Sequence, residues 1–488
     1  MTKKLKYIII AGVAVLVLTG LLLLLIFLPT GESGQESATG DAAYTDHAED
    51  HIDNEDNSLL IDRQSDELSH LVLTNSHGTF TMRRSASTGQ IVIDQLADVP
   101  INDEFAEFVW YGSLTMGWNY KVGDGTTPSD LSAYGLDSPR AVCKAYYNDG
   151  TTTGFSVGAQ VPASESGLYY MLVDGFEGVY VIYIDESFFQ GSSYWISDDV
   201  FSVGSMNSSD AVDIGKITIT GKSFSQAVVL SPVTTQDVSH PFYGYDYTVS
   251  CGNKTFSADD YNMSLLSDEL SYLTASEAEV YKPTAQQLSE YGIADPWAVV
   301  RFERSGREYI IRCGNKTADA MYFKLDGIDV IYSISAASYP MLTSLSADVL
   351  RSGELHVRQF KAVSGIKVAC AQGTWSFSMQ RKAMETDPSL YEYFAYKDGA
   401  QIELNLFKEV LGQFNNADIA SLDESADRTA PYLTVTISYY PEFGRAAETF
   451  QYYTTEYRRY LCVKDGQPMA CVTSLWMDKL IQTAQAAE

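Results

Sequence analysis

The sequence predicts an α+β protein made of tandem repeated units, each a mostly antiparallel sheet with covering helices, after one N-terminal transmembrane helix. Three observations lead to this fold class. An uncharged apolar run lies close to the N-terminus, two similar nine-residue strings stand 157 residues apart, and each is followed by alternating runs joined by short turns. Short turns favour antiparallel pairing. A chain of 488 residues is long enough for about two to four domains.

The N-terminal run indicates a membrane anchor. Residues 8–28 contain no charged side chain, and a helix of that length can cross a hydrocarbon core of about 30 Å. Lys3, Lys4 and Lys6 precede it, so the positive-inside rule places residues 1–6 in the cytoplasm. A cleaved signal peptide is the rival interpretation, but its apolar region is usually about 7–15 residues. We therefore expect a signal anchor at 7–28 in the cell membrane, with the rest of the chain extracellular.

The next segment, 29–62, is predicted to be an acidic disordered linker. It holds ten Asp or Glu residues and neither Lys nor Arg. Such a composition buries too little apolar surface to offset the entropy lost on ordering.

The repeated string is "LSAYGLDSP" at 131–139 and "LSEYGIADP" at 288–296. Each glycine is expected to take a left-handed backbone conformation at the exit of a helix. Each proline is expected to open the next strand, where its missing N–H is tolerated. The tyrosines are interpreted as packing residues, with ligand binding as the alternative. The residues concerned are Tyr134, Gly135 and Pro139 in the first copy, and Tyr291, Gly292 and Pro296 in the second.

Two hairpins are predicted after each proline, and the second of them turns on an Asp-Gly pair. A third copy begins at Pro431 and keeps the hairpins without the Tyr-Gly string. The separations from proline to Asp are 35, 30 and 34 residues. The turn pairs are Asp174-Gly175, Asp326-Gly327 and Asp465-Gly466.

These copies divide the exterior into repeat unit 1 at 63–206, repeat unit 2 at 207–351 and a degenerate repeat unit 3 at 352–488. Each unit is predicted to hold two strands, a helix, two hairpins and a closing helix. The central helices are expected near 103–117, 262–281 and 405–419, and the closing helices near 185–202, 335–352 and 475–485.

The combined pattern resembles the domain of unknown function 4340. The pattern is Tyr-Gly-(Leu/Ile)-x-x-Pro, a hairpin, and then an aromatic pair shortly before Asp-Gly. The aromatic pairs are Tyr169 with Tyr170, and Tyr322 with Phe323. The resemblance implies a membrane-anchored extracytoplasmic protein, often encoded beside components of ABC transporters, and it implies no known catalytic residues.

Composition excludes some classes of function. The chain has 33 basic and 63 acidic residues, a net charge of −30. Nucleic-acid binding needs a basic surface, so we expect no nucleic-acid partner. The 33 tyrosines suit half-buried strands, and aromatic platforms for sugars or peptides are the alternative.

No catalytic, cofactor-binding or metal-binding residue is predicted. Ser364 and Lys367 match a Ser-x-x-Lys pattern, but they lie in an alternating run typical of a strand. His47 and His51 are four residues apart, yet they lie in the linker, where ligands have no fixed geometry. A surface hydrolase with paired carboxylates stays open, because carboxylate separation cannot be read from sequence.

Two cysteines form a candidate disulfide. If the last hairpin turns on Gly466-Gln467, Cys462 and Cys471 face each other across adjacent strands; the alternative is two buried thiols. The pentapeptide "CGNKT" occurs at 251–255 and 313–317, and we interpret this repetition as a coincidence at strand ends.

The sequence therefore predicts a non-enzymatic binding protein. On the family resemblance, the expected partner is an ABC transporter permease or its cargo. The alternative is a cell-envelope protein that binds carbohydrate or peptide through exposed tyrosines.

Overall fold

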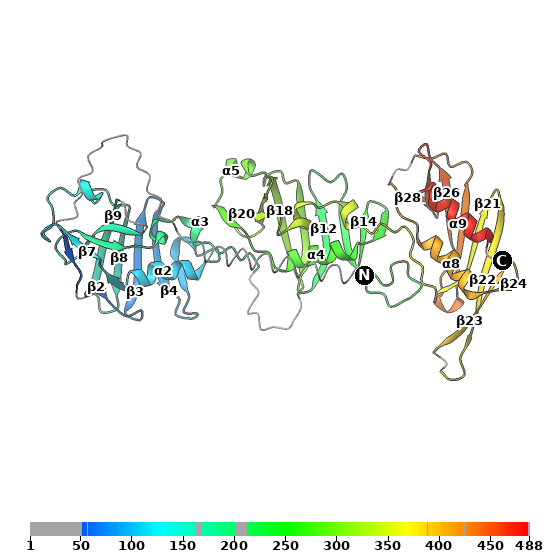
Figure 1. Cartoon of the computed structure of the whole chain (residues 1–488), viewed down its shortest axis with the longest axis horizontal. Coiled ribbons are helices and arrows are strands. Elements are labelled where there is room, and N and C mark those ends of the chain that lie inside the picture. Colours follow the sequence, from blue (N-terminus) through cyan, green and yellow to red (C-terminus); the bar gives the residue numbers. More distant parts are fainter. Residues whose placement is uncertain are drawn as a thin grey trace, which may run out of the picture. The chain divides into compact units, whose positions relative to one another are not determined.

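Antiparallel sheets organise the described part of the chain (Figure 1). The computed structural model describes residues 51–55, 57–162, 167–201, 212–387, 389–422 and 425–486. The predicted cytoplasmic tail, the predicted anchor and most of the predicted linker lie outside these residues. Within the described residues there are three large sheets and one two-stranded sheet.

The first large sheet has nine strands in the order β1-β7-β11-β10-β9-β8-β3-β4-β5. Its strands are β1 His51–Asp53, β3 Leu68–Asn75, β4 Gly78–Arg84, β5 Ile91–Ile93, β7 Tyr120–Val122, β8 Ala141–Tyr147, β9 Thr152–Gln160, β10 Leu168–Val173 and β11 Tyr180–Tyr183. The small sheet pairs β2 Leu59–Asp62 with β6 Thr115–Gly117.

The second large sheet also has nine strands, in the order β15-β14-β13-β12-β17-β18-β19-β20-β16. Its strands are β12 Ile214–Thr220, β13 Val228–Pro232, β14 Tyr247–Cys251, β15 Lys254–Ser257, β16 Glu277–Tyr281, β17 Ala298–Arg304, β18 Arg307–Lys316, β19 Ala320–Leu325 and β20 Val330–Ser335.

The third large sheet has eight strands, in the order β24-β23-β22-β21-β25-β26-β27-β28. Its strands are β21 Val363–Cys370, β22 Gly373–Ala383, β23 Tyr391–Lys397, β24 Ala400–Ile402, β25 Leu433–Tyr439, β26 Glu448–Thr454, β27 Arg459–Lys464 and β28 Gln467–Thr473.

The three sheets share one strand order. In each, the opening strand (β3, β12 or β21) pairs antiparallel with the first hairpin strand (β8, β17 or β25). The two hairpins extend the sheet on one side, and the strands that follow the opening strand extend it on the other. The third sheet keeps this order although its sequence lacks the Tyr-Gly string. A repeated antiparallel architecture is therefore confirmed; the three unit boundaries stay a prediction.

A central helix precedes the first hairpin of each sheet, near each predicted position. These helices are α2 Asp103–Gly112, α4 Asp260–Ser271 and α8 Leu404–Asn415. The side chains of Asn102 and Asp259 cap α2 and α4 by accepting backbone N–H groups of the first turn. Figure 1 shows α8 lying beside α9, Ser474–Ala486, over the third sheet.

The closing helices of the first two units differ from the prediction. In place of one helix at 185–202, the chain forms η3 Glu186–Phe189 and α3 Ser192–Trp195; in place of one at 335–352, it forms α6 Pro340–Thr343 and α7 Ala347–Leu350. Gly191 and Pro340 stand at the starts of α3 and α6, and both residue types interrupt a longer helix. The remaining short helices are η1 Asp94–Leu96, η2 Ser132–Tyr134, α5 Ala285–Glu290 and η4 Pro441–Phe443.

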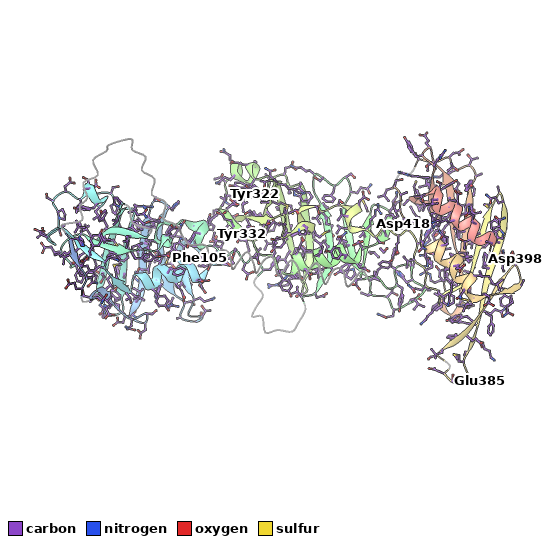
Figure 2. All side chains as sticks on the ribbon, viewed as in Figure 1. Phe105, Tyr322, Tyr332, Glu385, Asp398 and Asp418 are labelled. Atoms are coloured by element: carbon purple, nitrogen blue, oxygen red, sulfur yellow. The ribbon has the colours of Figure 1, made fainter. Side chains whose placement is uncertain are left out.

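The core follows the alternation of the strands. In β25, Leu433, Val435 and Ile437 are fully buried, with half-buried residues between them. Tyrosines follow the same rule: Tyr332 on β20 is fully buried, while Tyr322 on the neighbouring β19 is half-buried (Figure 2). Many tyrosines therefore serve the sheets rather than form exposed platforms.

Regular structure begins inside the predicted linker. The linker prediction extends to residue 62, but β1 and β2 lie within 51–62. Apolar Leu60 and Ile61, at 8% and 4% exposure, are buried there, so this part of the segment does bury apolar surface. Among the described residues, no helix is long and apolar enough to cross a membrane.

Candidate functional site

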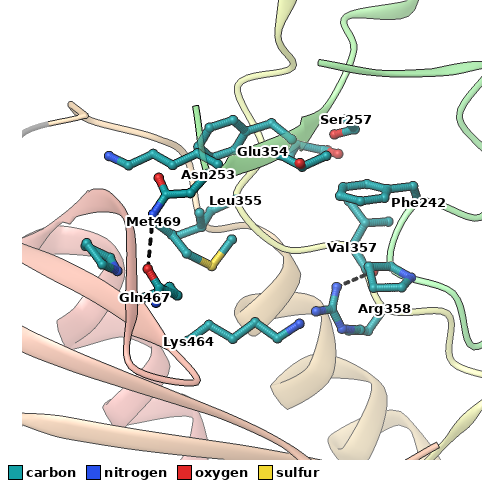
Figure 3. A pocket seen from close by; sticks show the side chains of 15 residues that line it. Phe242, Asn253, Ser257, Glu354, Leu355, Val357, Arg358, Lys464, Gln467 and Met469 are labelled. Carbon is teal, nitrogen blue, oxygen red and sulfur yellow. Dashed lines mark hydrogen bonds between the residues drawn. The ribbon is translucent and has the colours of Figure 1, made fainter. Parts of the chain in front are cut away.

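The best candidate site is a cavity of about 250 Å³ lined by β15, the segment 354–358 and β28 (Figure 3). β15 is the edge strand of the second sheet and β28 is the edge strand of the third. The lining residues are Pro241, Phe242, Asn253, Lys254, Thr255, Phe256, Ser257, Glu354, Leu355, Val357, Arg358, Lys464, Gln467, Pro468 and Met469.

Hydrogen bonds hold the walls of the cavity together. The side-chain amide of Asn253 donates to Oε1 of Gln467 at 3.0 Å, as Figure 3 shows. The backbone of Arg358 is clamped by Asn415 of α8, which accepts from its N–H at 3.0 Å and donates to its carbonyl at 2.9 Å. The position of Arg358 therefore depends on helix α8, whose inner face is buried.

A buried charge cluster lies beside the cavity, centred on the carboxylate of Glu448. Arg358 Nε lies 2.6 Å from Oε2, Lys464 Nζ lies 2.5 Å from Oε1, and Arg445 Nη2 lies 3.6 Å from Oε1. The hydroxyl of Tyr439 also donates to Oε2. Burial alone would raise the pKa of Glu448, but the positive charge of Arg358 and the hydrogen bonds from Lys464 and Tyr439 lower it to about 2.

His356 is buried next to this cluster with 1% of its surface exposed. Its Nε2 lies 2.6 Å from the hydroxyl of Tyr452, and its ring stacks on Phe414 with 4.3 Å between centroids. Burial, followed by the positive charge of Arg358, lowers the pKa of His356 well below the usual value. The imidazole is therefore neutral in the folded protein at pH 7.

This burial predicts that the protein loses stability as the pH falls from about 7 to 5. In the unfolded chain His356 takes up a proton near its ordinary pKa of about 6.5, but in the folded protein it stays neutral. The unfolded state then binds more protons, so the free energy of unfolding falls by up to about 1.4 kcal/mol per pH unit below 6.5. Thermal midpoints of His356→Phe should vary less between pH 7.5 and 5.5 than those of the parent. His77→Gln, which removes an exposed imidazole, is the control; equal pH dependence in all three proteins would contradict the prediction.

The Tyr-Gly turns have the predicted backbone conformation. Gly135 follows η2 with φ 64°, and Gly292 lies just beyond α5 with φ 75°. The following Leu136 and Ile293 are buried, at 6% and 3% exposure. The prolines do not open the strands themselves: β8 and β17 begin two residues after Pro139 and Pro296.

The motif tyrosines are half-buried and contact a second tyrosine edge-to-face. Tyr134 meets Tyr170 with 5.0 Å between ring centroids, and Tyr291 meets Tyr322 with 4.7 Å. The counterpart of Tyr322 in the first copy is therefore Tyr170, the second residue of the pair Tyr169-Tyr170, and not Tyr169. The strand pairs β10–β9 and β19–β18 carry the same register shift, with Met171 opposite Val157 and Phe323 opposite Cys313, so Tyr170 and Tyr322 occupy equivalent positions.

The structure adds a second glycine to each motif. Gly158 on β9 and Gly314 on β18 lie against the carbonyl oxygens of Tyr134 and Tyr291, each 2.2 Å from where a Cβ would stand. The second "CGNKT" supplies Gly314 and also Asn315, whose N–H donates to the carbonyl of Tyr291 at 2.8 Å. The first "CGNKT" supplies Asn253, Lys254 and Thr255 of the cavity wall. The two occurrences thus have different structural roles.

The Asp-Gly pairs occupy their predicted turns. Asp174-Gly175, Asp326-Gly327 and Asp465-Gly466 follow β10, β19 and β27 directly. Within the described residues, Asp326 is the one aspartate of the three that forms an ion pair. Arg312 donates to its two carboxylate oxygens at 2.7 and 3.0 Å. These turns are distant in sequence from the cavity lining, apart from Asp465-Gly466, which lies between Lys464 and Gln467.

The predicted pairing of the last two cysteines is wrong in its register. The hairpin turns on Asp465-Gly466, because Lys464 pairs with Gln467, and Leu461 is the residue opposite Cys471. Continued regularly from Lys464 and Gln467, the pairing would place Tyr460 opposite Cys471; the register shift moves this to Leu461, still one residue short of Cys462. Both cysteines are buried. Burial raises the pKa of the Cys462 thiol to about 12, so the thiol is in its unreactive neutral form.

The residues considered for chemistry by sequence are not brought together. Ser364 and Lys367 lie on strand β21, as predicted. His51 lies at the start of strand β1 rather than on a helix, and His47 is outside the described residues. No group of three or more His, Cys, Asp or Glu side chains placed to hold a metal occurs among the described residues.

Sequence reasoning missed the charge cluster, although one signal was present. β26 begins "ETFQYY", and its alternation places Glu448 on the same face as Phe450 and Tyr452, both fully buried. An acidic residue at an inward-facing strand position predicts a buried ionic partner. That partner, Arg358, lies 90 residues earlier in the chain. No sequence feature near Glu448 identifies it.

Comparison with known proteins supports the family resemblance in the middle of the chain. The family model described as Domain of unknown function (DUF4340) matches residues 252–433. This range contains the second copy of the motif, with Tyr291, Gly292, Pro296 and Asp326, and two walls of the cavity. No curated protein and no solved structure matches the chain. The resemblance to the domain of unknown function DUF4340 is therefore confirmed over residues 252–433.

Proposed function

We propose that the protein is a membrane-anchored extracytoplasmic binding protein that acts, without covalent chemistry, as an accessory component of an ABC-type transporter. The anchor is proposed from the uncharged run at 8–28 and the lysines before it. The link to a transporter is proposed from the family pattern. The ligand or partner would be a permease of the transporter or its cargo.

The cavity beside Glu448 is the observation that carries the binding proposal. It joins apolar side chains, such as Phe242, Leu355 and Met469, to charged ones, Arg358 and Lys464. A mostly apolar hollow with a few convergent polar groups is typical of a ligand site. Two sheet edges also border it, and sheet edges can receive an extended segment of another chain.

The proposal is tested by crosslinking the full-length protein in its native membrane, followed by affinity capture and mass spectrometry. A transporter permease or ATPase enriched over an unrelated single-pass protein is the expected result. Recovery of wall polymers alone, or of no specific partner from protein that remains folded, would remove the transporter from the proposal.

A second cavity favours the alternative function, a cell-envelope protein that binds carbohydrate or peptide. It measures about 890 Å³ and lies between α2, β6 and β11 of the first unit. Its aromatic side chains are unusually open: Phe108, Tyr111 and Tyr183 are 46%, 50% and 64% exposed. The carboxylates of Glu104, Glu107 and Asp185 also line it. Aromatic faces with nearby carboxylates can stack on and hydrogen-bond to sugars.

Binding of the full-length protein to purified peptidoglycan tests this alternative. Tyr183→Ala is expected to weaken binding, because it removes the most exposed aromatic face of the cavity. Tyr457→Ala is the matched control, since Tyr457 is 71% exposed and does not line the cavity. Equal binding by both variants, or no binding by the parent protein, would exclude this cavity as a wall-polymer site.

A further inference from the structure

The charge cluster beside the first cavity has an excess of positive charge. Arg358, Arg445 and Lys464 surround the carboxylate of Glu448, and Asp237 interacts electrostatically with Arg445. Three positive and two negative charges leave a formal excess of one. The whole chain, in contrast, carries a net charge of −30. A local cationic excess in an acidic protein calls for an anion from outside the cluster.

Two of the three cations, Arg358 and Lys464, line the cavity and have hydrogen-bond donors that can bind a ligand. The side chain of Arg358 is 5% exposed. Its Nε donates to Glu448 and its Nη1 donates to the carbonyl of Val357 at 2.9 Å, which leaves Nη2 without a partner among the described residues. The ammonium of Lys464 has three donors; it contacts Glu448 and lies over the ring of Phe450, 5.8 Å from its centroid.

The acidic side chain of the cavity lies away from Arg358 and Lys464. Glu354 also lines it, and the hydroxyl of Tyr245 donates to its Oε2. Figure 3 shows Glu354 well separated from the ends of Arg358 and Lys464, while those two ends lie near each other. Both cations contact the same carboxylate, Glu448, which agrees with this view. One end of the cavity is therefore cationic.

Seven of the fifteen lining residues are apolar and give the cavity a surface that can contact a hydrocarbon body. Phe242, Phe256, Leu355, Val357 and Met469 contribute to it. A volume of about 250 Å³ equals about eight water molecules at about 30 Å³ each. A compact ligand of about eight to twelve non-hydrogen atoms, with an anionic group at one end, is of this order of size and complements the charge.

We propose that this cavity binds a carboxylate attached to a compact apolar body, with Arg358 and Lys464 holding the carboxylate. The inference deepens the proposed binding function by naming its ligand chemistry, and it rests on that function. Arg358 presents Nη2 to one carboxylate oxygen and Lys464 presents its ammonium to the other. The same chemistry is offered by a free organic acid and by the C-terminal residue of a peptide.

The test is isothermal titration calorimetry of the full-length protein in detergent micelles, with empty micelles as the blank. Hexanoate represents the free acid and acetyl-leucine represents a peptide C-terminus; hexanamide and acetyl-leucinamide are their uncharged counterparts. Each carboxylate is expected to bind at least about tenfold more tightly than its amide, a difference of about 1.4 kcal/mol. Tighter binding of acetyl-leucine indicates a peptide source, and tighter binding of hexanoate indicates a free acid; either result supports the proposal.

Lys464→Met supplies the matched variant, because it removes one cation and leaves Glu448 paired with Arg358. It should weaken carboxylate binding by about tenfold or more. Lys382→Met, an exposed lysine on β22, should bind like the parent. Equal binding of acid and amide, absence of binding, or an unchanged Lys464→Met variant would overturn the proposal. Capture of a transporter subunit together with any of these results would leave the proposed function standing while rejecting this ligand.

Discussion

Replacing Glu448 by Gln is expected to lower the free energy of unfolding by about 3–5 kcal/mol. The substitution keeps the shape of the side chain but removes the charge that neutralises Arg358, whose side chain is only 5% exposed. An unpaired buried guanidinium would then remain inside the protein, with Lys464 and Arg445 close to it. Chemical denaturation monitored by circular dichroism measures the loss.

The matched control is Glu308→Gln. Glu308 pairs with Arg301 at 2.5 Å, but the two side chains are 54% and 52% exposed, so the loss should be about 0–1 kcal/mol. A loss at Glu448 no larger than that at Glu308 would contradict the importance of burial at this cluster.

The pair of Glu448 and Arg358 also makes the stability of the protein depend on pH in the acid range. The pKa of Glu448 is about 2 in the folded protein, below the ordinary value of about 4.3. Its contribution to stability is therefore complete above pH 4.3 and is lost as the pH falls toward 2. In Glu448→Gln this part of the acid dependence should disappear, whereas the dependence due to His356 between pH 7 and 5 should remain.

The second large effect is expected from Gly314→Ala, with a loss of about 2–4 kcal/mol. The new Cβ would stand 2.2 Å from the carbonyl oxygen of Tyr291 and 2.8 Å from Cδ1 of Ile293. Forcing this turn away from β18 costs about 1–3 kcal/mol as overpacking. It also weakens the hydrogen bond from Asn315 N–H to Tyr291, which contributes about 1 kcal/mol.

Gly412→Ala is the control for this prediction. Gly412 lies inside helix α8, and a Cβ there would meet nothing within 4 Å. Alanine is the better helix former, so this variant should be more stable than the parent by about 0.5–1 kcal/mol. Thermal melting of both variants measures the contrast, and a stabilised Gly314→Ala would show that the Tyr-Gly turn does not rest on β18.

Local pattern was sufficient for the strands, the hairpin turns and the repetition. The alternation of apolar and polar residues along a strand and the Asp-Gly pair at its turn are both features of a single hairpin. The amino-acid sequence alone therefore places the turns at Asp326-Gly327 and Asp465-Gly466. The left-handed conformation of Gly135 and Gly292 is predictable for the same reason, because it depends on a helix end and a buried residue close in the chain.

Closing helices and cysteine pairing are predicted less well. The sequence predicts one helix over 335–352, but the chain breaks it into α6 and α7, since packing against the sheet can favour two short turns over one longer helix. The pairing of Cys462 with Cys471 fails because the hairpin turns on Asp465-Gly466, one residue earlier than that pairing needs, and the register shift between Leu461 and Val463 only partly offsets the change.

The candidate site depends wholly on tertiary structure. The alternation of β26 places Glu448 inward, but its partners Arg358 and Lys464 come from a segment before the sheet and from the next strand. Likewise, the first "CGNKT" becomes a cavity wall only because β15 and β28 are edge strands near each other. Periodicity reports which way a side chain faces, whereas the pairing of distant charges depends on how whole sheets pack, and no short stretch of sequence encodes that packing.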